Sequence, residues 1–280
     1  MSNHLLVYQT DFGLQDGAVS AMYGVALSVS KDLQIYNLTH EIPQYDIWEA
    51  SYRLVQTLQY WEKGTVFVSV VDPGVGSNRK SIVAKTNSGH YVITPDNGTI
   101  THIKENVGIV EVREIDEEVN RLPNSGESYT FHGRDVYAYT GARLAAGKIT
   151  FEEVGSLVSI EELEFLRTMK VIEEEQSVTG MIDILDIRFG NLWTNIGKEY
   201  FEHLKVEHNE RLRVTIMNEN REVYGNEMIY VHSFADVNIG ETLIYVNSLN
   251  NIGIAINQGS FARAYQIGTG EKWKIKIQKR

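Results

Sequence analysis

Four short clusters of polar residues and glycine stand out because their side chains could bind or transform a small molecule. They are TDFG at residues 10–13, DPGVGSNR at 72–79, PDNGT at 95–99 and TFHGRD at 130–135. The first three follow predicted strands and the fourth precedes a predicted helix. Ligands in open α/β sheets bind at the carboxyl ends of strands. The candidate chemistry is therefore that of aspartate, arginine and histidine side chains.

The first two clusters each allow two interpretations. Asp11 could accept hydrogen bonds from ribose hydroxyls, or its carboxylate could cap a helix. The glycines of the second cluster allow a ligand to approach the backbone, beside Asp72 and Arg79. Alternatively, Asp72 and Arg79 close a tight turn as a surface ion pair. The residues alone leave both questions open.

The other two clusters are weaker when taken singly. Asn97-Gly98 predicts a hairpin turn. His132 stands among small and charged residues at a helix entrance, which makes it a general-base candidate. Arg134 and Asp135, which follow it, could simply pair with each other.

Two further polar groups lie in the C-terminal part of the chain. The first, DILDIRFGNLWTN at 183–195, interleaves aspartate and asparagine with Phe189 and Trp193. The second comprises residues 247–248 and 257–260. Aspartate and asparagine at turns are usually structural. Their density here would also suit a purine and the zwitterionic tail of an amino acid.

Alternating strands and helices must position the first four clusters. Apolar residues at 18, 22, 25 and 29 keep helical spacing, and Asp46 with Glu49 predicts the start of a second helix. TVFVSVV at 65–71 is apolar on both faces, as in a central strand. Further strands are expected at 5–8, 33–38, 81–85, 91–94 and 109–115, and a helix at 136–146. This order predicts an α/β domain with a mainly parallel central sheet.

The period changes after an acidic stretch at 161–175, so we place the domains at 1–168 and 169–280. Short strands are expected at 181–187, 212–217, 228–232, 243–247, 252–256, 262–267 and 273–277. Lysines alternate along the last of these strands, as on a protected sheet edge. The second domain is therefore predicted to be an antiparallel β-barrel-like structure.

Composition narrows the function classes. The 280 residues include no cysteine and carry a formal net charge of −11, which excludes disulfides and disfavours nucleic acid and anionic membranes. No apolar run is long enough to span a bilayer, and residues 1–9 carry no secretory pattern, so we expect a cytoplasmic protein. No compact metal-binding motif is present, and we expect neither a metal nor a cofactor.

Taken in order, the clusters resemble the S-adenosylmethionine hydrolases that form adenosine, relatives of fluorinating and chlorinating enzymes. The resemblance extends from Thr10 to about Ser260. It implies that Asp72, Arg79 and His132 are catalytic. Because the halogenating relatives replace that aspartate and histidine, the three residues together imply water rather than halide as the nucleophile.

The resemblance also implies contacts to the ribose and sulfur of the substrate. Asp11 matches the carboxylate that holds the ribose hydroxyls, while Trp48 and Phe131 match aromatic walls. Ala18 departs from the family pattern, because the halogenating relatives have a serine there.

Other contacts carry over to the C-terminal domain. Asp186 and Ser248 match groups that hold the amino and carboxylate ends of the methionine. Asn191 matches the adenine contact, aided by backbone near Gln258. The binding set is completed by Phe189, Phe234 and Asn257. Leu249 stands where the halogenating relatives have an arginine beside the serine, which leaves the carboxylate contact open.

The family fold implied by the resemblance agrees with the two domains predicted above, and it implies a homotrimer with substrate bound at the subunit interface. The expected partner is S-adenosylmethionine. Two alternatives remain: a synthase that forms a 5′-halogenated nucleoside, and a non-catalytic module that binds S-adenosylmethionine or a nucleoside. A metal-dependent hydrolase is disfavoured by the missing motif.

Overall fold

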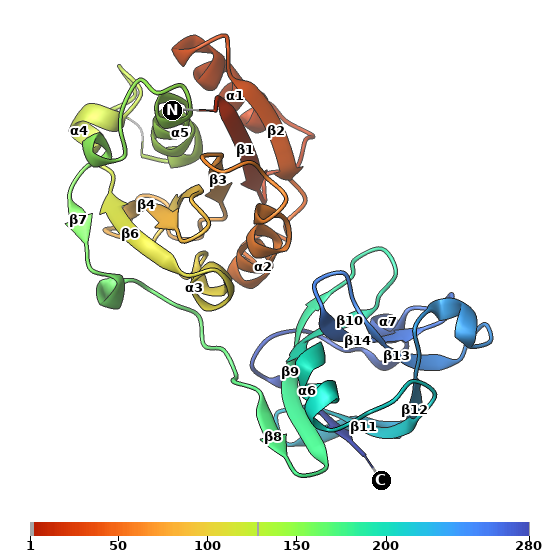
Figure 1. Cartoon of the computed structure of the whole chain (residues 1–280). Helices are drawn as coiled ribbons and strands as arrows, with labels where there is room; N and C mark the ends of the chain where they lie inside the picture. Colours follow the sequence, from red (N-terminus) through yellow and green to blue (C-terminus); the bar gives the residue numbers. More distant parts are fainter. Residues whose placement is uncertain (1–2, 128, 280) are drawn as a thin grey trace. The chain divides into compact units, whose positions relative to one another are not determined.

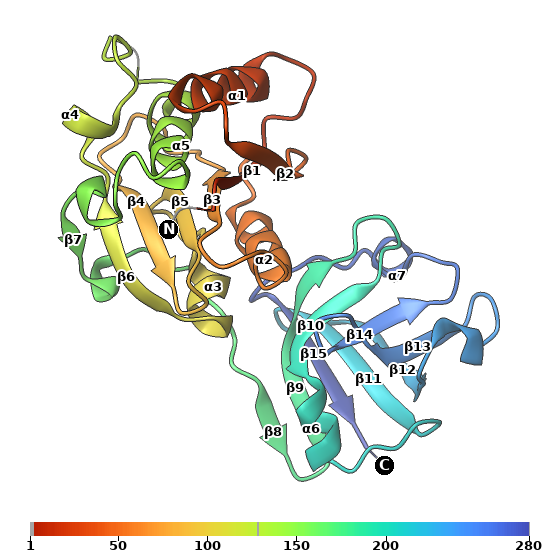
Figure 2. The same cartoon turned by 45° about the horizontal axis from the view of Figure 1, so that its top comes forward.

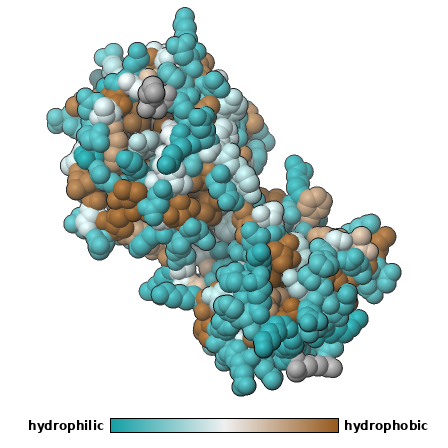
Figure 3. All heavy atoms as spheres, in the orientation of Figure 1, coloured by the Kyte–Doolittle hydropathy of each residue, from teal (hydrophilic) through white to brown (hydrophobic). Residues whose placement is uncertain are grey.

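The computed structural model describes residues 3–127 and 129–279, and the chain divides into two compact units between Leu166 and Arg167 (Figure 1). The face drawn in Figure 3 is hydrophilic over most of each unit, with smaller hydrophobic groups in between. Among the described residues, no helix has both the length and the apolar character needed to cross a bilayer.

The N-terminal unit contains one seven-stranded sheet with helices on both faces (Figures 1 and 2). Its strands are β1 (Leu5–Thr10), β2 (Gln34–Thr39), β3 (Val66–Val70), β4 (Ser81–Thr86), β5 (Tyr91–Pro95), β6 (Ile109–Glu114) and β7 (Leu157–Val158). The order is β2-β1-β3-β5-β4-β6-β7. The first four strands in this order are parallel, and β4, β6 and β7 join by antiparallel pairing. The predicted α/β unit with a mainly parallel sheet is confirmed.

Two apolar clusters hold the helices against the sheet. The helices are α1 (Ala18–Val29), α2 (Ile47–Leu58), α3 (Thr101–Asn106), α4 (Glu117–Asn120) and α5 (Tyr139–Ala145), with short 3₁₀ turns at Glu152–Val154 and Ile160–Glu162. Met22 and Ala142, from α1 and α5, pack with Val68 on one face. α2 and α3 cover the other face around Phe67. A Cβ on Gly141 would lie 2.6 Å from Cγ2 of Val68, so α5 lies directly on the sheet because this residue is glycine.

The helix starts follow local rules in part. The Asp46 carboxylate accepts the Glu49 N–H at 2.9 Å and begins α2, as predicted. The Glu49 carboxylate does not complete the capping box. It accepts hydrogen bonds from Arg53 instead, at 3.1 and 3.2 Å. The helix expected at 136–146 begins earlier, with a π-helical segment at Gly133–Ala138 that continues into α5.

The predicted hairpin at Asn97-Gly98 is wrong. These residues connect β5 to α3. The Asn97 side chain donates to the carbonyl of Val71 at 2.9 Å and accepts from Thr99, which fixes the loop beside the end of β3. No hairpin forms here because β5 is already paired on both sides, with β3 and with β4, so the chain must leave the sheet after β5.

The C-terminal unit is a closed seven-stranded mixed barrel. Its strands are β9 (Ser177–Leu185), β10 (Leu192–Gly197), β11 (Arg211–Asn218), β12 (Arg221–Tyr230), β13 (Thr242–Val246), β14 (Asn251–Ile256) and β15 (Trp273–Gln278), with β8 (Ile172–Glu174) paired outside the ring. Pairing of β10 with β9 closes the barrel. All barrel pairs are antiparallel except β12 with β13, so the expected barrel is found with one parallel pair. Helices α6 (Lys198–His203) and α7 (Phe261–Tyr265) and a 3₁₀ turn (Phe234–Asp236) complete the unit.

Two expectations for this unit are wrong. Residues 262–267 are not a strand, because most of them belong to α7 (Phe261–Tyr265), which Ser260 caps by accepting the Arg263 N–H at 3.3 Å on its hydroxyl. The rings of Phe261 and Tyr265, one helical turn apart, lie 4.7 Å from each other. β15 is not an edge strand, since it pairs with both β11 and β9. Lys276 on β15 forms an ion pair with Glu174 of β8 at 2.7 Å. The strand β10 was not predicted.

Candidate active site

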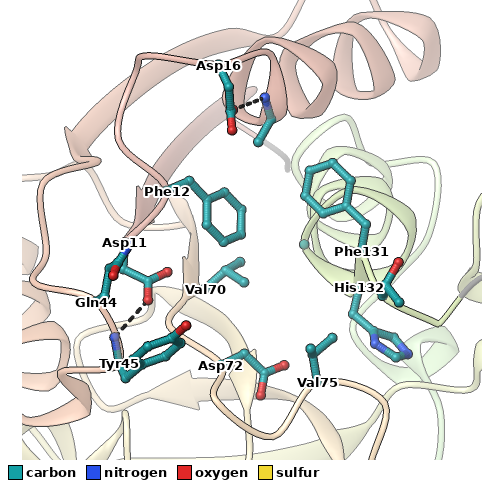
Figure 4. A pocket seen from close by; sticks show the side chains of 13 residues that line it. Asp11, Phe12, Asp16, Gln44, Tyr45, Val70, Asp72, Val75, Phe131 and His132 are labelled. Atoms are coloured by element: carbon teal, nitrogen blue, oxygen red, sulfur yellow. Dashed lines mark hydrogen bonds between the residues drawn. The ribbon is translucent and has the colours of Figure 1, made fainter.

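A cavity of about 290 Å³ opens at the carboxyl ends of β1 and β3 in the N-terminal unit (Figure 4). Asp11 follows β1, Asp72 lies two residues beyond β3, and Phe131 and His132 stand before the π-helical segment. The lining consists of Asp11, Phe12, Asp16, Ala18, Gln44, Tyr45, Val70, Asp72, Val75, Thr130, Phe131, His132 and Gly133. Four of the six residues predicted for this part of the site therefore share one cavity.

Asp72 and Arg79 form a shielded, two-pronged ion pair. Arg79 Nε donates to Asp72 Oδ1 at 2.7 Å, and its Nη2 donates to Oδ2. The two side chains are 5% and 12% exposed, so this is not the surface pair that the sequence also allowed. Burial by itself lowers the pKa of Arg79, but the hydrogen bond to Asp72 and the neighbouring Tyr137 outweigh it, and the pKa is raised. The guanidinium of Arg79 therefore stays charged.

Asp11 lies at the opposite side of the cavity from His132 (Figure 4). Its carboxylate accepts the backbone N–H of Tyr45 at 3.0 Å and does not cap α1, whose first residue follows Gly17. Burial raises the pKa of Asp11, the Tyr45 N–H lowers it, and the charge of Asp72 adds a smaller upward shift. The second oxygen of Asp11 is available to accept from hydroxyl groups.

Aromatic rings form one wall of the cavity. Phe12 and Phe131 meet edge to face with ring centroids 5.8 Å apart (Figure 4). Trp48 does not line the cavity. Its ring packs edge to face on His102 at 4.7 Å. Within this unit the aromatic contacts to a ligand in the cavity thus fall to Phe12, Phe131 and Tyr45.

His132 is buried and hydrogen-bonded outside the Asp72–Arg79 pair. Its Nε2 lies 3.0 Å from Nη2 of Arg121 and 3.8 Å from Oε2 of Glu117. Burial lowers the pKa of His132; Glu117 opposes this, while Arg121 and Arg79 add to it. Asp72 also acts on this pKa, so the three residues predicted to be catalytic are electrostatically connected, although His132 makes no hydrogen bond to the other two within the described chain.

A second cavity, of about 700 Å³, lies in the C-terminal unit. It contains all seven residues predicted for that unit: Asp186, Phe189, Asn191, Phe234, Ser248, Asn257 and Gln258. Its further lining residues are Arg188, Trp193, Tyr245, Asn247, Ile256, Gly259, Ser260 and Arg263.

Aromatic side chains and a tight hairpin loop shape this second cavity. Trp193 Nε1 donates to the Tyr245 hydroxyl at 3.0 Å, and the Phe234 and Tyr245 rings lie 5.0 Å apart. Burial raises the pKa of Tyr245 to about 12. Two backbone hydrogen bonds close the loop between β9 and β10: the Asp186 N–H donates to the Asn191 carbonyl at 2.9 Å, and the Gly190 N–H donates to the Asp186 carbonyl at 2.6 Å. Flat, apolar walls beside amide groups fit a purine ring.

The polar residues here have different roles. The Asn257 side chain donates to the Val237 carbonyl at 2.9 Å and so supports the fold. Asn247 Oδ1 accepts the backbone N–H of Leu249 at 2.9 Å. Asn191 Oδ1 is buried and has no hydrogen-bond partner among the residues described. Such an atom is left for a ligand to satisfy.

Several residues that line the N-terminal cavity, or that contact its lining, were not predicted from the sequence. Phe12 is the neighbour of Asp11 and could have been found in the same motif. Tyr45 lines the cavity from a loop in which its own backbone has a positive φ of 68°. No sequence pattern predicts this placement. Arg121 contacts His132. In the sequence its spacing from Glu117 indicates only an ordinary i,i+4 ion pair.

Two arginine side chains that the sequence did not predict as site residues also line the C-terminal cavity. Arg188 and Arg263 line it together with Ser248. Leu249, which replaces the expected arginine, does not line it. The cationic partner for a carboxylate can therefore come from a different part of the sequence.

Comparison with known families decides the relationship. The family model for the SAM hydroxide adenosyltransferase N-terminal domain matches residues 6–155, and the model for the C-terminal domain matches residues 180–274. The chain belongs to this family. The matched ranges contain both cavities.

Individual relatives include two kinds of enzyme. A protein of Methanocaldococcus jannaschii named (R)-S-adenosyl-L-methionine hydrolase is 40% identical over 200 residues, which cover 70% of this chain and 68% of that protein. A fluorinase of Nocardia brasiliensis is 27% identical over 298 residues, covering 98% and 97%. The crystal structure of an uncharacterized conserved protein from Thermotoga maritima matches with a TM-score of 0.88 and 32% identity, covering 98% of this chain and all of that one.

Proposed function

We propose that this protein hydrolyses S-adenosylmethionine to adenosine and methionine. A water oxygen bonds to the ribose 5′ carbon, the carbon–sulfur bond breaks, and its electron pair stays on sulfur as a neutral thioether. The positive charge of the sulfonium leaves as the proton that the water loses. The observation that carries the proposal is the shielded Asp72–Arg79 pair beside a cavity that also contains Asp11 and His132.

This reaction suits the side chains in the N-terminal cavity. The leaving group departs neutral and needs no acid, so the protein must fix a water in line with the bond and help remove its proton. We assign that task to Asp72, Arg79 and His132. Phe12 and Phe131 exclude bulk water and attract the sulfonium through their ring faces.

We assign the remaining substrate contacts by charge and shape. Asp11 accepts from the ribose hydroxyls. Asp186 and Ser248 bind the amino and carboxylate ends of the methionine, with Arg188 and Arg263 as further cationic partners. The adenine is bound by the side chains Phe189, Asn191 and Phe234 and by the backbone around Asn257 and Gln258. Trp48, which lies outside the cavity lining, would contact the substrate only beyond that lining.

We further propose a homotrimer in which substrate binds between subunits. The resemblance to the family supports this assembly, as does the division of the polar side chains between two units. Sedimentation equilibrium tests it, and a monomer at catalytic concentrations would contradict it.

Oxygen-labelled water tests the reaction. Purified protein is incubated with S-adenosylmethionine, and the adenosine is analysed by mass spectrometry. Label in the 5′ hydroxyl is expected. The competing halogenase activity, favoured by the fluorinase relatives, is tested by adding fluoride, chloride or bromide. A 5′-halogenated nucleoside as the main product would refute the hydrolase, and no turnover at all would favour the binding module.

A further inference from the structure

Arg121 contacts His132 at the edge of the N-terminal cavity. Its Nη2 lies 3.0 Å from His132 Nε2, and its side chain is 10% exposed. A second interaction comes from Glu117, whose Oε2 accepts from Arg121 Nε at 3.2 Å and from Nη2. The Tyr129 ring lies 4.8 Å from the guanidinium carbon. Arg121 is therefore held in place from two sides.

The chemistry of the contact determines the proton positions. A guanidinium has only donors, so the nitrogen that it approaches must accept. His132 Nε2 consequently carries no proton, and the neutral ring carries its proton on Nδ1. The Nδ1 atom is buried and has no hydrogen-bond partner within residues 3–127 and 129–279. The protein thus leaves the one donor of this ring unused.

The surrounding charges favour the same state. Glu117, Arg121, Arg79 and Asp72 act on His132, with ring contacts from Tyr129 and Tyr137. Burial is the largest influence and lowers the pKa of the imidazole; Glu117 and Asp72 raise it, Arg121 and Arg79 lower it, and the pKa is lowered on balance. An imidazolium would also place an N–H against the guanidinium of Arg121. The neutral ring fits, and the charged ring does not.

We propose that Arg121 is a positioning residue that holds His132 as the neutral Nδ1–H tautomer and so leaves Asp72 to take the proton from the attacking water. This rests on the proposed hydrolysis. Each Asp72 oxygen accepts one hydrogen bond from Arg79 and keeps a second lone pair, and the carboxylate lines the cavity.

The step balances. The water oxygen forms a bond to the 5′ carbon, the carbon–sulfur pair goes to sulfur, and the water proton goes to Asp72. His132 gains and loses no proton in this step. Its Nδ1–H stays on the ring, buried and without a partner among the described residues.

Two variants and a matched control test the role of Arg121. Arg121→Met removes the donor, and Arg121→Lys keeps a cation that can only donate. Arg53→Met is the control, because Arg53 forms an i,i+4 pair with Glu49 on α2 and is 11% exposed, against 10% for Arg121. We expect Arg121→Met to lower kcat by roughly 10- to 100-fold with little change in KM. The acidic limb of the pH–kcat profile of Arg121→Met should move to higher pH, because the His132 imidazole gains a proton more easily without the guanidinium. Arg121→Lys should recover part of the loss, and Arg53→Met should match wild type.

Nitrogen–proton NMR of isotope-labelled histidine reads the tautomer without turnover. The His132 resonances are assigned by their loss in His132→Gln. Wild type should show protonated Nδ1 and bare Nε2 at neutral pH, and Arg121→Met should shift toward a mixture. An imidazolium or an Nε2–H ring in wild type would overturn the proposal, as would an unchanged tautomer and pH profile in Arg121→Met. Hydrolysis by wild type is scored separately, so its absence refutes the proposed function and not the tautomer.

Discussion

The Asp72→Asn variant separates a catalytic ion pair from a structural one. Asparagine keeps the size of the side chain and one acceptor for Arg79, but it cannot take a proton as the carboxylate does. Loss of a general base costs about 10²- to 10⁴-fold in rate. At 1.36 kcal/mol for each factor of ten, this corresponds to about 2.7–5.5 kcal/mol in the activation barrier. We expect kcat to fall by this amount and KM to change little, because Asp72 acts on the water.

The same variant should also lose stability. The two side chains are 5% and 12% exposed, so the arginine is left nearly buried without its counter-ion. Removing one partner of a buried pair costs about 3–5 kcal/mol, and a hydrogen bond to a charged group is worth about 1.5–3 kcal/mol. Because asparagine still accepts from Arg79, we expect a loss near the lower of these ranges, measured by urea unfolding.

Glu49→Gln is the matched control. It removes the carboxylate of the Glu49–Arg53 pair, whose side chains are 13% and 11% exposed and lie outside the cavity lining. Adenosine release, followed by chromatography, gives kcat and KM for both variants. The control should retain kcat, because Glu49 lies outside the cavity lining. Burial raises the pKa of Glu49, so removing its charge should not lower stability at neutral pH. If Asp72→Asn also retained wild-type kcat while losing stability, the pair would only hold its loop, and the assignment of Asp72 would be refuted.

Three further substitutions have defined outcomes. Asp11→Asn should weaken substrate binding yet raise stability at neutral pH. Burial raises the Asp11 pKa, so the charged form opposes folding there, and the gain should vanish below the usual pKa of 3.8 in pH-dependent urea unfolding. Because the pKa of His132 is lowered in the folded state, the folded protein binds fewer protons than the unfolded protein below pH 6.5, and wild type loses stability as the pH falls. In His132→Gln the free energy of unfolding should therefore depend less on pH in this range. A steeper loss would contradict this. Gly190→Ala should cost roughly 1–3 kcal/mol. Its φ is +69° and its Cβ would lie 1.9 Å from Ser260 Oγ, whereas Gly240→Ala, with φ +86° and no atom within 4 Å, should lose less in the same assay.

Local pattern determined much of the fold from the sequence alone. The stripe of apolar residues gave α1 at Ala18–Val29, and the doubly apolar run at 65–71 gave the central strand β3. Such patterns depend on residues a few positions apart, which one helix turn or one strand brings together. For the same reason, the motifs around Asp11, Asp72 and His132 were recognisable as candidates for chemistry.

The barrel was predicted in outline but not in detail. The sequence pattern does not predict β10, and it predicts an edge strand at β15, which pairs on both sides. Closure depends on β9 and β10 pairing with each other while each also pairs elsewhere, which local propensity does not encode. At 262–267 the Ser260 cap and the Phe261–Tyr265 contact favoured a helix over the extended state.

The chemistry of the site was decided only by tertiary structure. The sequence allowed Asp72 and Arg79 to be a surface turn, and burial at the sheet edge made them a shielded pair. It left both Asp72 and His132 as proton acceptors, and the contact between Arg121 and His132, which only the fold brings about, is the basis on which we propose Asp72. Burial and the approach of one side chain to another from a separate segment set protonation states, and neither is a property of a residue type or of its spacing.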